Sequence, residues 1–258
     1  MNNVIFAFSL TLIAGLSTGI GSITALFAKR TNTKFLSLSL GFSAGVMIYV
    51  SMIEIFTKSK NYLSAAHGDI KGYWLAVIAF FAGIILIAMI DFFIPSTEND
   101  IGASLNQENR LKRMGVITAL SIAIHNFPEG MATFTSALQD VHLGIAIAVA
   151  LAIHNIPEGI ATSLPIYFSE GNKKKAFLIS FFSGMTEPVG AILGYAVLKP
   201  FFNDSTFGIL FGIVAGIMVF ISLEELLPMA REYEKSKASI IGAICGMAVM
   251  ALSLLLLL

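Results

Sequence analysis

Long runs of apolar residues, separated by short polar stretches, recur eight times along the chain. Each run reaches roughly 20 residues, the length that an α-helix needs to cross the hydrocarbon core of a bilayer. The runs are too long and too evenly apolar to be the alternating strands of a membrane β-barrel. The pattern therefore predicts eight transmembrane helices. We place them at residues 4–28, 35–57, 73–94, 114–138, 142–168, 176–198, 205–229 and 238–257.

The composition also indicates an all-α integral membrane protein. Of the 258 residues, 56% are hydrophobic and 12% are charged. The charged share is about half of that in a soluble protein, which leaves too few polar side chains to cover a water-soluble domain. The formal net charge is zero, so nothing points to a nucleic-acid partner. With one cysteine, Cys245, neither an internal disulfide nor a thiolate metal cluster is expected. We expect one membrane domain over residues 1–258, with the lipid bilayer as its surroundings.

The basic residues predict the orientation of these helices. Of the 16 Lys and Arg residues, three lie in each of the first, third, fifth and seventh loops, and the other four lie in even-numbered loops. Lys and Arg accumulate in cytoplasmic loops, so the odd loops, including the long loop 95–113, are predicted to be cytoplasmic and both termini outside. The first run has no basic residue before it and has Lys29 and Arg30 after it, which favours a retained helix over a cleaved signal peptide. We expect the protein in the cell (cytoplasmic) membrane.

Two copies of one polar motif interrupt the fourth and fifth predicted helices. HNFPEGMAT occupies residues 125–133 and HNIPEGIAT occupies residues 154–162, with seven of the nine positions identical. The connection between the two helices is short, so the helices are expected to be antiparallel neighbours. Both copies then lie near the membrane midplane, related by a two-fold axis in the membrane plane. This is the layout of an inverted-repeat transporter with a central binding site.

The motifs place ionisable side chains at a depth where they are costly. Glu129, Glu158 and Glu187 each lie near the middle of a predicted helix, and a charge there costs about 2.5–3.5 kcal/mol when it is not compensated. His125 and His154 lie four residues before two of these glutamates, on the same helix face. Imidazole and carboxylate ligands together suit zinc, iron and related metals. Ligands from two helices are enough to complete a four-coordinate site.

A second, oxygen-rich site is predicted beside the first. Asn126, Asn155 and Glu187 add amide and carboxylate oxygens, which harder metal ions prefer. Both motif glutamates would then bridge the two sites.

The paired HNxPEG motifs, the eight runs and the predicted outside termini resemble the ZIP (Zrt/Irt-like) family of divalent-metal permeases, in particular its bacterial zinc-uptake branch. The stretches GFSAGVM (41–47) and SLEELLPMA (222–230) extend the likeness to nearly the whole chain. The resemblance implies a first metal site of His125, Glu129, His154 and Glu158, and a second of Asn126, Glu129, Asn155, Glu158 and Glu187.

The resemblance implies uptake of Zn²⁺, and of Fe²⁺, manganese or cadmium, into the cytoplasm. These ions are substrates, and no organic cofactor is expected. In such relatives the metal-binding helices are thought to shift against a scaffold like an elevator. No GxxxxGK[ST] sequence is present, so ATP hydrolysis is not the expected energy source. Many relatives carry a His-rich cytoplasmic loop, but loop 95–113 has no histidine. The oligomeric state stays open, with a homodimer as one alternative.

The same ligands would also suit an intramembrane metal-dependent hydrolase or a di-iron oxidase. HExxH is absent, and the order His-x-x-x-Glu differs from the Glu-x-x-His of di-iron helices. A catalytic zinc also keeps one position open for water, whereas this site has ligands to spare. A structural metal clamp does not explain why both ligand sets lie at the midplane. A permease, and not an enzyme, is therefore the leading interpretation.

Two interpretations stay open for a set of further residues. They either take part in the metal pathway or are ordinary apolar or solvated side chains. The set comprises Met47, Glu54, His67, His142, Glu224 and Glu225.

Overall fold

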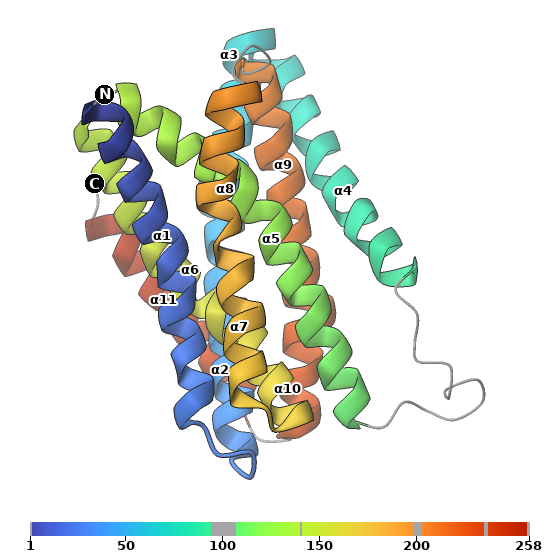
Figure 1. The fold of residues 1–258 in the computed structure, drawn as a ribbon. Coiled ribbons are helices and arrows are strands. Elements are labelled where there is room, and N and C mark those ends of the chain that lie inside the picture. The colour runs from blue at the N-terminus through green and yellow to red at the C-terminus, as the bar shows by residue number, and fades with distance from the viewer. Residues whose placement is uncertain (1, 94–106, 140, 199–202, 235–236, 257–258) are drawn as a thin grey trace.

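The computed structural model describes residues 2–93, 107–139, 141–198, 203–234 and 237–256, and helices make up nearly all of these ranges (Figure 1). The label η marks short π-helical stretches. The elements are α1 (Asn2–Phe27), α2 (Thr33–Val50), η1 (Ser51–Ile55), α3 (Phe56–His67), α4 (Asp69–Phe93), α5 (Gln107–Gln139), α6 (Val141–Glu170), α7 (Lys173–Gly184), α8 (Thr186–Leu193), η3 (Gly194–Leu198), α9 (Asp204–Phe220), η5 (Ile221–Leu226), α10 (Leu227–Tyr233) and α11 (Ala238–Leu256).

Within the described ranges, seven helical stretches are long and apolar enough to cross a membrane. They are Asn3–Phe27, Thr33–His67, Asp69–Phe92, Ile147–Glu170, Lys173–Ala196, Asp204–Tyr233 and Ala238–Leu256. The remaining predicted run lies inside α5, which has 33 residues but carries a polar motif and a charged first part. The predicted all-α fold of a multi-pass membrane protein is confirmed. Predicted residues 94 and 257, and residues 95–106 of the long loop, lie outside the described residues.

The predicted start of the fourth helix at residue 114 is wrong, because α5 already begins at Gln107. Hydropathy misses these first two turns because four of their residues are charged. Each of the four forms an ion pair with a different part of the chain, which holds the turns in place. The pairs are Arg30–Glu108 at 3.0 Å, Arg110–Glu232 at 2.9 Å, Lys112–Glu170 at 2.9 Å and Arg113–Asp91 at 2.8 Å.

The outer faces of several helices are apolar. Trp74 and Phe81 on α4, and Ile244 and Leu252 on α11, are among the large apolar side chains that are exposed. Apolar surface of this extent marks contact with another apolar phase. These faces therefore fit contact with lipid.

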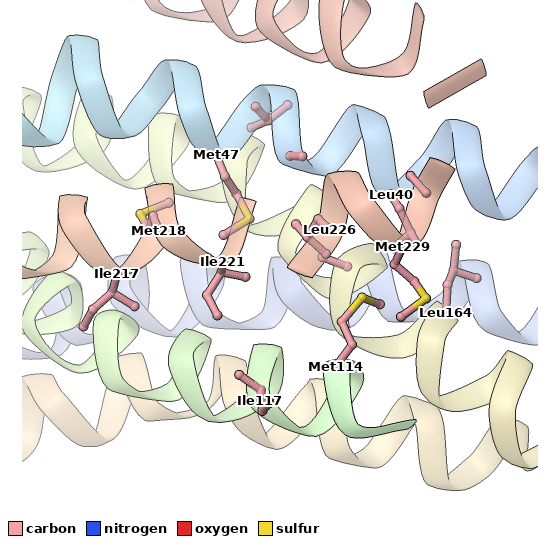
Figure 2. Packing of buried hydrophobic residues seen from close by; sticks show 14 of the residues in the cluster. Leu40, Met47, Met114, Ile117, Leu164, Ile217, Met218, Ile221, Leu226 and Met229 are labelled. Atoms are coloured by element: carbon pink, nitrogen blue, oxygen red, sulfur yellow. The ribbon is translucent and has the colours of Figure 1, made fainter. Parts of the chain in front are cut away.

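The helices divide into two packed groups. One group contains α1, α5, α6, α7 and α8, and the other contains α2, α3, α4, α9, α10 and α11, with α2 against α6 between the groups. Buried apolar side chains from both groups meet near the end of the bundle where α5 begins (Figures 1 and 2). Leu40, Met114, Leu164, Leu226 and Met229 belong to this cluster. At that end, apolar packing fills the space between the groups.

The second group is built as an inverted repeat. A Cβ placed on Gly45 of α2 would lie 2.0 Å from the carbonyl oxygen of Ala243 on α11, and a Cβ on Gly216 of α9 would lie 2.0 Å from that of Phe80 on α4. The reciprocal contacts are Gly246 against Phe42 and Gly83 against Ile213, at 2.1 Å each. The residue numbers of matching positions in α2 and α9 differ by one constant value, and those in α4 and α11 differ by another. Glycine is required at these crossings because any side chain would meet the neighbouring backbone.

The π-helical stretches η1 and η5 follow the same register. Ser51 donates its hydroxyl to the carbonyl of Met47, and Ser222 donates to that of Met218. This register makes Glu54 the counterpart of Glu225, and Lys58 the counterpart of Met229.

Both chain ends lie toward the same half of the bundle in Figure 1. This arrangement agrees with an even number of crossings. Which side of the membrane this end faces stays a prediction.

Candidate metal centre

The two copies of the motif lie side by side in the middle of α5 and α6. Each copy has a proline within the helix, Pro128 in α5 and Pro157 in α6. A proline inside a helix leaves one carbonyl without its usual partner. The carbonyl of Pro157 accepts a hydrogen bond of 2.8 Å from the hydroxyl of Ser43 on α2. The motif on α6 is thus tied to the second helix group.

The histidine of each motif is paired with the glutamate of the other. His125 Nε2 lies 2.8 Å from Glu158 Oε1, and His154 Nε2 lies 3.3 Å from Glu129 Oε2. The sequence spacing placed each His and Glu on one face of its own helix, and the structure turns these faces toward each other. The four side chains are therefore brought together from two helices, and the two pairs are related by the repeat.

Glu187 and the two asparagines lie beside these pairs. Asn155 Nδ2 donates to Glu187 Oε1 and, at 2.9 Å, to the carbonyl of Ala14 on α1. Asn126 Nδ2 points at the carbonyl of Ser183 on α7, at 3.4 Å. Glu187 lies in the first turn of α8, after the break between α7 and α8 at Met185. An acidic residue is favoured there by the helix dipole.

Close helix crossings extend the inverted repeat to this group. A Cβ on Gly130 of α5 would lie 2.0 Å from the carbonyl oxygen of Glu187, and a Cβ on Gly159 of α6 would lie 2.0 Å from that of Thr18 on α1. In the reciprocal contacts, a Cβ on Gly190 would lie 2.2 Å from the carbonyl oxygen of Phe127, and a Cβ on Gly21 would lie 1.9 Å from that of Ile156. Helix α1 therefore contacts α6 as α8 contacts α5, and the predicted inverted-repeat organisation is confirmed.

The side chains of this centre are buried and incompletely paired. All seven predicted ligands have at most 3% of their surface exposed. In the described part of the chain, six of their buried atoms have no hydrogen-bond partner: His125 Nδ1, Asn126 Oδ1, His154 Nδ1, Asn155 Oδ1, Glu158 Oε2 and Glu187 Oε2. A buried polar atom without a partner costs about 1–3 kcal/mol. Four of the six are oxygens, which a cation would satisfy.

The side chains are nevertheless not arranged around one point. Among the described residues, no three His, Cys, Asp or Glu side chains are grouped so that they could hold a metal ion. The imidazoles and carboxylates face one another as two pairs instead. The structure thus brings all seven predicted residues into one buried cluster, and their division into two metal sites stays a prediction.

A pocket of about 70 Å³ reaches this cluster from one end of the bundle. Glu129 and His154 line it, together with Glu54, Lys58 and Tyr62 from η1 and α3. Its volume is enough for several water molecules. Lys58, one of the four basic residues assigned to the even-numbered loops, is therefore part of this pocket. The sequence signal that could have placed Lys58 beside Glu54 is their spacing of four residues, which puts both side chains on one helix face.

The further residues whose role the sequence left open lie in different environments. Met47 is buried in the apolar cluster, and Glu224 and His142 are exposed. His67 is exposed and bonded to the Ser205 hydroxyl at 2.8 Å. Among the residues whose role the sequence left open, Glu54 lines the pocket.

Comparison with known proteins agrees with this picture. The model of a family described as "ZIP Zinc transporter" matches residues 95–254, more than half of the chain. The chain belongs to the ZIP zinc transporter family. Among its ZIP relatives named "Zinc transporter ZupT", one from Oceanobacillus iheyensis is 59% identical and covers 100% of both chains. One from Lysinibacillus sphaericus is 58% identical over 99% of this chain and 98% of its own, and one from Streptococcus mutans is 58% identical over 97% of each.

ZIP-family membership decides between the alternative functions of the chain. ZIP proteins are transporters and not enzymes, so the hydrolase and the di-iron oxidase are set aside.

Proposed function

We propose that this protein carries Zn²⁺ across the cell membrane into the cytoplasm, through the buried cluster on α5, α6 and α8. The observation that carries the proposal is the crosswise pairing of His125 with Glu158 and of His154 with Glu129. Two imidazoles and two carboxylates, buried together between antiparallel helices, form a donor set that zinc prefers. The relatives named zinc transporters support the same cargo.

The ligands divide into two sets in this proposal. His125, Glu129, His154 and Glu158 bind the first ion, and Asn126, Asn155 and Glu187 join the two glutamates around the second. The buried oxygens without a partner on Asn126, Asn155, Glu158 and Glu187 support the second set. Its oxygen-rich character suits Fe²⁺ and Mn²⁺ as further cargo, and Cd²⁺ is expected to compete with zinc at the first set.

The two helix groups supply the two parts that alternating access requires. The group with α1, α5, α6, α7 and α8 holds every proposed ligand, and the other group packs against it mainly where α2 meets α6. The pocket reaches Glu129 and His154 from the end that the basic residues predict to be outside. At the opposite end, the pairs Arg110–Glu232 and Arg113–Asp91 join α5 to the second group. Sliding the ligand-bearing group would break these pairs and open the inner end.

The test is uptake of radiolabelled zinc by the purified protein in proteoliposomes, with Fe²⁺, Mn²⁺ and Cd²⁺ as competitors. We expect saturable zinc uptake that each competitor reduces. Protein-free liposomes provide the control. A well-folded protein that moves none of these ions would contradict the proposal.

A further inference from the structure

Two hollows at the predicted outer end of the bundle meet at Lys58. The inner one is the pocket that contains Glu54, Glu129 and His154. The outer one is lined by Lys58, Asn61, Tyr62, Ala65 and Asp204. Both hollows include Lys58 and Tyr62. A path from the surface to Glu129 and His154 therefore passes beside Lys58.

The ammonium group of Lys58 is held by the first carboxylate on this path. Lys58 Nζ lies 2.8 Å from Glu54 Oε1, and the two side chains are 35% and 19% exposed. The other oxygen, Glu54 Oε2, is buried and has no hydrogen-bond partner in the described part of the chain. A cation on a flexible tether thus takes one oxygen of a carboxylate whose second oxygen is left for another cation. Lysine suits this place because its stem packs on apolar surface while its charged end moves.

The fold does not require a lysine at this position. The inverted repeat places Glu225 where Glu54 lies, and Met229 where Lys58 lies. Met229 is buried in the apolar cluster, so the same helical geometry accepts an uncharged side chain of similar length. The positive charge is therefore a feature of one mouth of the pathway and not of the helix packing.

We propose that Lys58 is a gating cation, which occupies Glu54 until a divalent ion displaces it and which thereby sets the apparent affinity for metal. This inference rests on the proposed function, the transport of divalent ions. A positive charge beside the pathway repels every entering cation. An ion that gains imidazole and carboxylate ligands further in offsets this repulsion, whereas Mg²⁺, which dehydrates reluctantly, does not. Lys58 then favours zinc over the abundant hard cations.

The test compares zinc uptake by proteoliposomes containing wild type, Lys58→Gln, Lys58→Arg and Lys60→Gln. We expect Lys58→Gln to lower the half-saturation concentration for zinc about threefold or more, with the larger effect at low ionic strength. It should also make uptake sensitive to millimolar Mg²⁺, while Lys58→Arg stays near wild type. Lys60 is the matched control, since it has the same charge on the same helix but lies over the Tyr73 ring at 5.3 Å and lines neither hollow.

The partner of Lys58 gives an independent arm. Glu54→Gln alone should raise the half-saturation concentration, because the ammonium is then left unpaired in the pathway. Adding Lys58→Gln should bring it back toward the wild-type value. If Lys58→Gln does not fold, Lys58→Met, which introduces the residue type found at the related position, takes its place.

Different results would overturn the gating role and the proposed transport function. Wild-type zinc uptake together with an unchanged half-saturation concentration and unchanged Mg²⁺ sensitivity in the neutral Lys58 variants would overturn the gating role alone. A lower maximal rate without a change in half-saturation would also overturn it, since that result indicates a structural role. Wild-type protein that carries no divalent ion would remove the proposed function and the gating role together.

Discussion

Thr18 occupies the place in the first half of the inverted repeat that Glu187 occupies in the second. The carbonyl oxygen of Thr18 lies against Gly159, and that of Glu187 lies against Gly130, each 2.0 Å from a Cβ placed on the glycine. The backbone is thus repeated at this point while the side chain is not. The repeat supplies a carboxylate at only one of two related positions, so the proposed second metal set is asymmetric.

This asymmetry predicts an effect on metal preference. Glu187→Gln removes a charged oxygen ligand from the second set and leaves both histidines in place. We expect the maximal uptake of Mn²⁺ and Fe²⁺ to fall several-fold more than that of zinc, because harder ions depend more on carboxylate oxygen. The measurement is the uptake of each metal by proteoliposomes. Thr18→Val, at the related position, is the matched control and should leave the ratio between metals unchanged. Equal loss for all metals would mean that the two sets act as one.

The motif glutamates predict a more severe loss. Glu129→Ala and Glu158→Ala each remove a ligand shared by both proposed sets and leave a buried histidine without its partner. We expect uptake of every metal to fall to background in membranes that contain normal amounts of protein. Glu224→Ala, an exposed glutamate away from the cluster, is the control for a change of charge. Uptake of normal size in well-expressed Glu158→Ala would contradict the bridging role.

Much of the fold could be predicted from two signals, the apolar runs and the repeated motif. Each of these signals lies within a short stretch of sequence. Hydropathy marks each apolar run, and the near-identity of residues 125–133 and 154–162 predicts that His125 and His154 lie at related positions, which the crosswise pairs confirm.

The remaining parts of the centre depend on tertiary packing that leaves little trace in the sequence. AGLSTGIG (14–21) and SGMTEPVG (183–190) occupy related places, yet only their glycines at the second and last positions are identical. The repeat that brings Glu187 to Asn155 is therefore not visible by comparing these segments. The charged start of α5 was missed for a similar reason, since its ion pairs are made with residues distant in the chain, such as Arg30 and Glu232.

The orientation in the membrane is a third prediction. Cys245 is exposed on α11, so Cys245→Ser gives a background without thiols. In that background, we expect Asn61→Cys to react with a membrane-impermeant maleimide added to intact cells. Asn61 lies in the region of the second loop, and the even-numbered loops are predicted to be outside because the odd loops are predicted to be cytoplasmic. Lys174→Cys, in the fifth loop region, should react only after permeabilisation. The opposite labelling pattern would reverse the predicted orientation and place the pocket at the inner face.

The glycine crossings predict where the fold tolerates no added carbon. Gly130→Ala and Gly159→Ala would each place a methyl group 2.0 Å from a backbone carbonyl oxygen of the neighbouring helix, and backbone cannot move aside as a side chain can. We expect each change to lower the free energy of unfolding by about 2 kcal/mol or more and to reduce uptake, because α5 and α6 carry the ligands. Gly19→Ala is the matched control, since its new methyl meets the ring of Phe181 at 3.0 Å, and a ring can rotate or shift. Thermal unfolding in detergent, followed by uptake measurements on the same preparations, compares the three. If Gly19→Ala were as destabilising as Gly130→Ala, backbone proximity would not be what these motif glycines provide. A loss of uptake in Gly130→Ala at unchanged stability would instead mean that the methyl group displaces the Glu187 carboxylate without loosening the helices.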